Sequence, residues 1–293
     1  MTDLALADIT RNFIKTKAPC AAGYRWFLRR QEFGSSYQAL LDDLVRDGRV
    51  DDACWLLDQL GPTSDVLQLA GMDAEALVFA GQVECTGSVD VGSVLRTGRG
   101  LTARGGVFVG DRLQVGDSLL VDGAVQCGGA IQAGADVRVE WGLDAAGAVV
   151  CEGNVRAGWG FTSGAEARVG GEALIGQDMQ VAGDLVCGQG VKVGGDLLAQ
   201  GQVHVSRGIH AGGSVSATRH VRVGWGIRAG GDILSGGAIR AGESLLATGV
   251  IEAGEGYGVF AGVDVCMETW EDSARVTARS RPARLLSGWW HAP

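Results

Sequence analysis

The sequence predicts a mainly β fold, a single-stranded triangular parallel β-helix with a small α-helical cap at its N-terminal end. Over residues 77–265, a bulky uncharged side chain, here called the anchor, recurs at every sixth position from Leu77 to Val263. Two residues after each anchor comes a smaller apolar residue, usually with a polar residue between them. The position three after the anchor is glycine in 18 of the 32 repeats. An unbroken period of this kind is the signature of a solenoid.

Each hexad is interpreted as one short strand followed by one corner. In Val191-Lys192-Val193-Gly194, the in–out–in alternation of a strand is followed by glycine, whose missing side chain suits a tight corner. Three hexads per coil are favoured because Trp141 and Trp159 lie 18 residues apart, so their rings would stack on adjacent coils. The equal spacing of His204, Arg222 and Arg240 gives the same indication.

Three segments follow from this pattern: a helical N-terminal capping module over 1–76, the solenoid over 77–265 and a C-terminal capping tail over 266–293. In the first segment, helices are predicted over 37–46, after the capping serines Ser35 and Ser36, and over 50–60. Gly48 and Gly61 are expected to end them. An end coil exposes unpaired strand edges and apolar side chains, so both terminal segments are expected to cover one. A binding role for either segment stays open.

The C-terminal tail departs from the hexad rule. A strand is predicted over 271–279, because Ala274, Val276 and Ala278 alternate with polar residues. Trp270, Trp289 and Trp290 are expected to bury a large area against the last coils.

Composition and charge exclude several classes of protein. The chain has 49 glycines, but its 46% hydrophobic content excludes a disordered linker. A net charge of −9 argues against direct nucleic-acid binding. No membrane span or signal peptide is predicted, and the expected location is cytoplasmic. Four cysteines fall on inward positions and are interpreted as small core residues, not as bridges or metal ligands: Cys85, Cys127, Cys151 and Cys187.

No motif indicates catalysis, a cofactor or a metal site, so the protein is predicted not to be an enzyme. The candidate site residues are instead partner-binding ones on the outside of the solenoid. Trp141 and Trp159 lie at corners, where they can anchor a partner or brace one another. His204, Arg222 and Arg240 form a ladder of basic side chains, which is either an anion-binding stripe or merely a solvated one. Together they are hypothesised to form one binding patch.

Two known families have related repeats. Hexapeptide acyltransferases also wind triangular coils, but their repeat runs small–x–aliphatic–Gly. Here the order is aliphatic–x–small–Gly, as in Ile227-Arg228-Ala229-Gly230. This order resembles that of the bactofilins, polymer-forming cytoskeletal proteins, over about 77–265. The resemblance implies a triangular β-helix and, through free coil ends, self-assembly.

The overall design, an acidic single-chain rod with folded terminal segments, looks similar to bacterial immunity proteins that neutralise secreted toxins. The functional expectation is therefore a non-catalytic cytoplasmic protein that sequesters a protein toxin, such as a nuclease effector, through the side of the β-helix. The alternative is a bactofilin-like scaffold that self-assembles.

Overall fold

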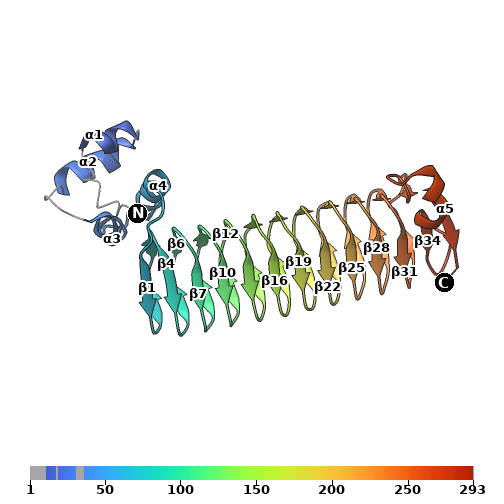
Figure 1. The fold of residues 1–293 in the computed structure, drawn as a ribbon, viewed down its shortest axis with the longest axis horizontal. Coiled ribbons are helices and arrows are strands. Elements are labelled where there is room, and N and C mark those ends of the chain that lie inside the picture. Colours follow the sequence, from blue (N-terminus) through green and yellow to red (C-terminus); the bar gives the residue numbers. More distant parts are fainter. Residues whose placement is uncertain (1–10, 18, 31–35, 293) are drawn as a thin grey trace.

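The computed structural model describes residues 11–17, 19–30 and 36–292. Its main body is a straight parallel β-helix, with a group of helices at the N-terminal end and a short irregular segment at the other (Figure 1). Each complete coil contributes one strand to each of three parallel sheets, which we name A, B and C. The triangular β-helix that the sequence predicts is confirmed.

Sheet A has 13 strands: β1 (Val66–Leu69), β4 (Gln82–Cys85), β7 (Leu101–Ala103), β10 (Leu119–Val121), β13 (Val137–Val139), β16 (Val155–Ala157), β19 (Ala173–Ile175), β22 (Val191–Val193), β25 (Ile209–Ala211), β28 (Ile227–Ala229), β31 (Leu245–Ala247), β34 (Arg275–Thr277) and β36 (Trp289–His291).

Sheet B has 11 strands: β2 (Met72–Ala74), β5 (Val89–Val91), β8 (Val107–Val109), β11 (Val125–Cys127), β14 (Leu143–Ala145), β17 (Phe161–Ser163), β20 (Met179–Val181), β23 (Leu197–Ala199), β26 (Val215–Ala217), β29 (Ile233–Ser235) and β32 (Ile251–Glu252).

Sheet C has 12 strands: β3 (Leu77–Phe79), β6 (Val94–Thr97), β9 (Arg112–Val115), β12 (Ile131–Ala133), β15 (Val149–Cys151), β18 (Ala167–Val169), β21 (Leu185–Cys187), β24 (Val203–Val205), β27 (Val221–Val223), β30 (Ile239–Ala241), β33 (Val259–Phe260) and β35 (Leu285–Ser287).

The register repeats every 18 residues, as Val137 pairs with Val155 on the next coil. Anchors point inward and form one continuous core along the rod. The four inward cysteines predicted to be core residues are all buried. Corner glycines allow neighbouring coils to approach closely: a Cβ on Gly194 would lie 2.0 Å from the carbonyl oxygen of Gly176. This contact explains why glycine follows so many strands.

The solenoid does not keep its period at either predicted limit. Strand β1 begins at Val66 and β2 at Met72, so the first coil starts before residue 77. Near the other end, Val259 pairs with Ile239, twenty residues earlier, because two extra residues enter the corner around Gly256. The predicted anchors Tyr257 and Val263 are consequently exposed, and Val259 takes the inward place. The prediction of an unbroken register was wrong for these two positions.

Four helices precede the solenoid: α1 (Arg11–Thr16), α2 (Ala21–Arg30), α3 (Tyr37–Arg46) and α4 (Val50–Leu60). The last two have the predicted bounds. Ser36 caps α3, since its hydroxyl oxygen accepts a hydrogen bond from the Ala39 N–H at 3.2 Å. Helices α1 and α2 were not predicted, and α2 buries Trp26 and Phe27 in a second, smaller core with α3 and α4.

The helical module packs against the sheet C side of the first coils. The Gln38 carboxamide accepts from the Ala80 N–H at 2.9 Å and donates to the Val78 carbonyl at 3.0 Å. Asp58 and Asp51 of α4 form ion pairs with Arg96 and Arg112. The inward side chains of β1 and β2 remain only partly buried: Leu67, Leu69 and Met72. The module therefore covers one side of the first coil, whereas the sequence predicted that it would cover the whole end of the coil.

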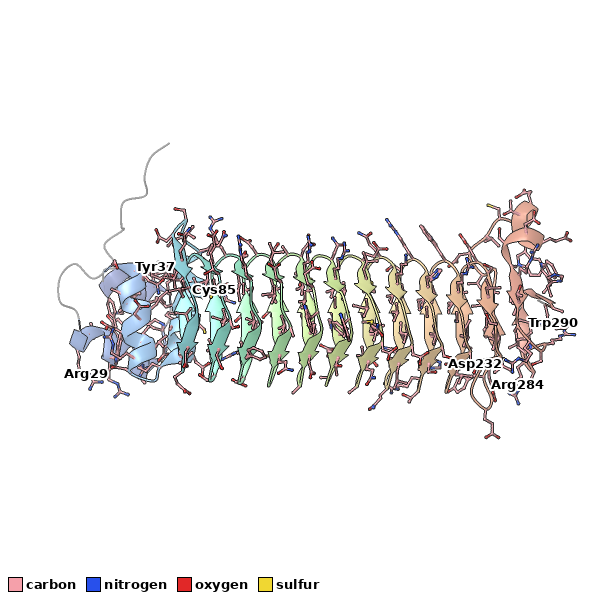
Figure 2. The ribbon with its side chains drawn as sticks, turned by 90° about the horizontal axis from the view of Figure 1, so that it is seen from below. Arg29, Tyr37, Cys85, Asp232, Arg284 and Trp290 are labelled. Carbon is pink, nitrogen blue, oxygen red and sulfur yellow. The ribbon has the colours of Figure 1, made fainter. Side chains whose placement is uncertain are left out.

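The C-terminal tail extends two of the sheets. A 3₁₀ turn (Met267–Thr269) and α5 (Trp270–Ser273) precede β34. The strand predicted over 271–279 is therefore too long at its start, where the chain is helical, but Val276 in β34 and its neighbours Ala274 and Ala278 are buried in the expected alternation. Trp290 pairs with Val276 in register, and its indole N–H donates to the Ala278 carbonyl at 3.2 Å. Trp270, Trp289 and Trp290 are all half-buried. Figure 2 shows Trp290 at the opposite end of the rod from Tyr37.

Candidate binding surfaces

The three faces of the prism differ in charge. The middle residue of each strand points outward, and neighbouring coils align these residues in rows. On sheet B the charged residues in this row are all carboxylates: Asp73, Asp90, Asp144 and Glu252. On sheet C they are all arginines, accompanied by one histidine: Arg96, Arg168, His204, Arg222 and Arg240. An acidic chain thus presents an acidic face and a basic face on one rigid body.

Trp141 and Trp159 form a stack at the ridge where sheet A turns into sheet B, here called the A–B ridge. Their ring centroids are 6.0 Å apart and their planes differ by 9°. The two side chains are 58% and 59% exposed. The Trp159 N–H donates to the Trp141 carbonyl at 3.1 Å, so the backbone fixes the spacing of the rings. The predicted stacking is present, and it leaves most of the aromatic surface open to solvent.

The tryptophan stack lies between side chains of opposite charge. On the sheet A side, Arg138 pairs in register with Arg156, and Arg138 also forms an ion pair with Glu140 at 2.6 Å. On the sheet B side, Asp144 lies in a shallow hollow that also includes Asp90, Phe108, Gln126. Phe108 is 38% exposed there. Basic groups of a partner would therefore be attracted only on the sheet B side of the stack.

The predicted basic ladder is also present. His204 pairs in register with Arg222, and Arg222 with Arg240. All three side chains are exposed, and Arg240 lies over the Phe260 ring at 5.1 Å. None of the three forms an ion pair with a residue in the described part of the chain.

The ladder and the tryptophan stack do not form one patch. The ladder lies on sheet C, and the stack lies on the ridge between the other two sheets. A single binding patch made of all five predicted residues was therefore wrong in its geometry. The reason is that successive hexads lie on different faces of the triangle: the two tryptophans follow strands of sheet A, whereas the ladder lies on strands of sheet C.

One exposed aromatic group escaped the sequence analysis. Trp225 lies at the ridge where sheet C turns into sheet A, here called the C–A ridge, and is 52% exposed. The Arg207 guanidinium lies over its ring at 5.5 Å. The two residues are 18 apart in the sequence, the same signal that predicted the stack of Trp141 on Trp159.

The buried thiols are held in their protonated form. The Cys151 thiol donates to the Ala135 carbonyl at 2.9 Å, and burial raises its pKa to about 11. Burial also raises the pKa of Cys187. Neutral buried thiols are poor nucleophiles and poor metal ligands.

Two features are absent from the residues that the structure describes. No group of three or more histidine, cysteine or carboxylate side chains is arranged to hold a metal ion there. Within the same residues, none of the helices has both the length and the apolar character needed to cross a bilayer.

The comparisons with known proteins concern the helical module. A family model described as the YdhT N-terminal domain matches residues 1–60. The match ends at the last residue of α4, before the first strand of the solenoid. Neither the curated proteins nor the solved structures contain a match to this chain.

Proposed function

We propose that this chain is a non-catalytic binding protein that captures a protein partner on the side of the β-helix. The exposed stack of Trp141 on Trp159 carries the proposal. Two large aromatic rings held 6.0 Å apart by the solenoid backbone lose little conformational entropy on binding. Tryptophan is enriched among the residues that dominate interface energies.

The charge around the stack indicates the kind of partner. Sheet B adjoins the A–B ridge, and its outward charged residues are carboxylates, including Asp90 and Asp144. A partner with a basic surface would be attracted and oriented by this face. A toxin that acts on nucleic acid has such a surface, so we propose a cytoplasmic immunity protein that sequesters a nuclease-type toxin.

Co-expression tests this proposal. The protein encoded next to this chain in its genome would be expressed with and without it, and cell growth and complex formation on purified proteins would be measured. We expect this chain to rescue growth and to form a stable complex with the neighbouring protein. Trp159→Ala should lower the affinity of the complex at least tenfold and reduce the rescue. Trp225→Ala is the matched control, because Trp225 is similarly exposed on another ridge. Equal effects of the two substitutions would remove the stack from the site.

A second function, a self-assembling scaffold of the bactofilin kind, is favoured by one observation. Leu67, Leu69 and Met72 on the first coil are only partly buried, although they point toward the core. Such an end can stack on another copy. Electron microscopy separates the two functions, since a scaffold forms filaments and a sequestering protein forms discrete particles. Leu69→Asp is expected to abolish filaments but to leave toxin capture intact.

A further inference from the structure

One row of outward residues on sheet C keeps a simple order along five successive coils. Its members pair in register from strand to strand: Val186, His204, Arg222, Arg240 and Phe260. The three exposed side chains of the basic ladder are thus bounded at each end by a half-buried apolar residue. Adjacent strands are about 4.8 Å apart, so the row spans about 19 Å of the rod.

The arginines of this ladder differ from the other outward arginines of sheet C. Arg96 and Arg168 each form an ion pair with a carboxylate of the chain. Arg222 and Arg240 form none with a residue that the structure describes. Like charges in adjacent strands repel one another, so this part of the face is stabilised by a partner that brings carboxylates to it.

The corners beside the ladder do not neutralise it. Residues 200–208, 218–226 and 236–244 form three successive strands of sheet C with their corners, and they contain four arginines and one carboxylate, Glu243. Glu243 lies on the C–A ridge, where its N–H donates to the Trp225 carbonyl at 3.2 Å. The carboxylate is therefore at the margin of the face, and the ladder is a positive surface in a chain of net charge −9.

The other end of the same sheet shows what such arginines bind. Helix α4 lies beside the first coils (Figure 1) and sets Asp58 against Arg96 at 2.5 Å and Asp51 against Arg112 at 2.9 Å. The two aspartates are seven residues apart, which places them on one face of the helix. The two arginines belong to the paired strands β6 and β9. An acidic helix bound to arginines of sheet C is thus a contact that this fold already makes.

We propose that the row from Val186 to Phe260 binds an acidic α-helix of a partner protein, which lies along the rod. Carboxylates three or four residues apart in a helix are separated by about 4.5–6 Å along its axis. Successive coils are about 4.8 Å apart, so three successive carboxylates remain in register with His204, Arg222 and Arg240. The arginines offer paired N–H donors to each carboxylate, and the histidine offers one.

The ends of the row extend the match beyond charge. Val186 and Phe260 each lie one coil beyond the ladder, so apolar residues one helical step outside the three carboxylates would pack on them. The expected stripe on the partner is apolar, acidic, acidic, acidic, apolar. This contact lies on sheet C and does not depend on the proposed capture of a toxin, which uses the A–B ridge.

A helix is favoured over a single strand of nucleic acid by the state of the nearby aromatic rings. Proteins that bind such strands stack bases on open aromatic faces. Here the Arg240 guanidinium lies over the Phe260 ring at 5.1 Å, and the Arg207 guanidinium lies over the Trp225 ring at 5.5 Å. The rings beside the ladder are therefore already covered on one face by arginine.

Fluorescence anisotropy with the full chain tests the proposal. The probe is a labelled peptide of alanine and glutamine, cross-linked between turns to keep it helical, that carries three glutamates at successive steps of one stripe and a leucine at each end of it. A control peptide of the same composition distributes the glutamates around the helix. We expect the striped peptide to bind at least tenfold more tightly at about 20 mM sodium chloride, and to be released at about 500 mM, because salt screens exposed charge pairs.

Charge reversal on the protein identifies the surface. Arg222→Glu should weaken binding of the striped peptide at least tenfold. Arg222→Glu combined with Arg240→Glu should instead bind a peptide that has lysines in place of the glutamates. Arg156→Glu is the matched control, since Arg156 is an exposed arginine at the same outward strand position on sheet A, and it should have much less effect.

Three results would overturn the proposal. The striped and control peptides could bind equally, which would make the ladder a general site for polyanions. An oligothymidylate could bind more tightly than the striped peptide, which would assign the face to nucleic acid. Binding could also be insensitive to Arg222→Glu, or absent at low salt. None of these results bears on toxin capture, which Trp159→Ala tests on a different ridge.

Discussion

The carboxylate of Asp178 occupies the space next to the backbone of Gly195 on the following coil. A Cβ at Gly195 would lie 2.1 Å from Oδ1 of Asp178, and the same oxygen accepts the Asp196 N–H at 2.8 Å. The arrangement repeats along the A–B ridge, where Asp196 accepts from the Ser214 N–H and Asp232 from the Val250 N–H. These carboxylates link one coil to the next and require glycine beside them.

Substitution of Gly195 should therefore depend on Asp178. Gly195→Ala is expected to destabilise the protein by about 1–3 kcal/mol, because the added methyl group overlaps the carboxylate. Asp178→Ala alone should cost about 1 kcal/mol for the lost hydrogen bond. The double variant should be more stable than the sum of the two effects predicts, as measured by urea denaturation. Strict additivity would show that the two side chains do not meet.

The changed register near the end of the solenoid predicts a contrast between two neighbouring residues. Val259 is 1% exposed and Tyr257 is 46% exposed. Val259→Ala should destabilise the last coils, by about 1–2 kcal/mol for the lost burial of two methyl groups. Tyr257→Ala should cost less, because about half of the side chain is exposed and its ring makes an edge contact with His220 at 5.2 Å. Hydrogen exchange of the Ile239 and Val259 amides measures this difference, and a larger effect of Tyr257→Ala would support the unbroken hexad period.

Gln38 joins the helical module to the solenoid through both ends of its carboxamide. Gln38→Glu retains the acceptor for the Ala80 N–H but replaces the donor to the Val78 carbonyl with an oxygen. We expect a loss of about 1–3 kcal/mol, the cost of leaving a buried polar group without its partner. Faster exchange of the Ala80 amide would report separation of α3 from β3. Gln68→Glu on the exposed part of β1 is the control, and an equal effect there would assign the loss to negative charge alone.

The buried thiols predict alkaline destabilisation. Burial raises the pKa of Cys151 from 9.0 to about 11, so between these values the folded chain keeps a proton that the unfolded chain releases. The folded state binds more protons, and stability falls as the pH rises from 9 toward 11. Below pH 9 the contribution of this thiol is complete.

Urea denaturation at pH 7, 9 and 10 measures this loss. Cys151→Ala should reduce the fall in stability above pH 9, since alanine is the inward residue on many other coils and does not titrate. Cys266→Ser, at an exposed thiol, should leave the fall unchanged. A pH profile that is identical in the wild type and Cys151→Ala would contradict the assignment.

Much of the architecture follows from local pattern. The three-residue strands, the 18-residue coil and helices α3 and α4 were predicted because each depends on residues close in the sequence or on a strictly repeated period. The stack of Trp141 on Trp159 was predicted for the same reason. A parallel β-helix places identical hexad positions above one another, so spacing in the sequence becomes spacing in the structure.

Tertiary structure decided what local pattern does not contain. The side of the first coil that the helices cover depends on contacts such as Gln38 with Ala80, which are 42 residues apart. Val259 faces the core in place of Tyr257, and this depends on how the tail strands pair with the last coils. The separation of the tryptophan stack from the basic ladder arises because the coil winds three faces, and only the winding assigns each residue to one.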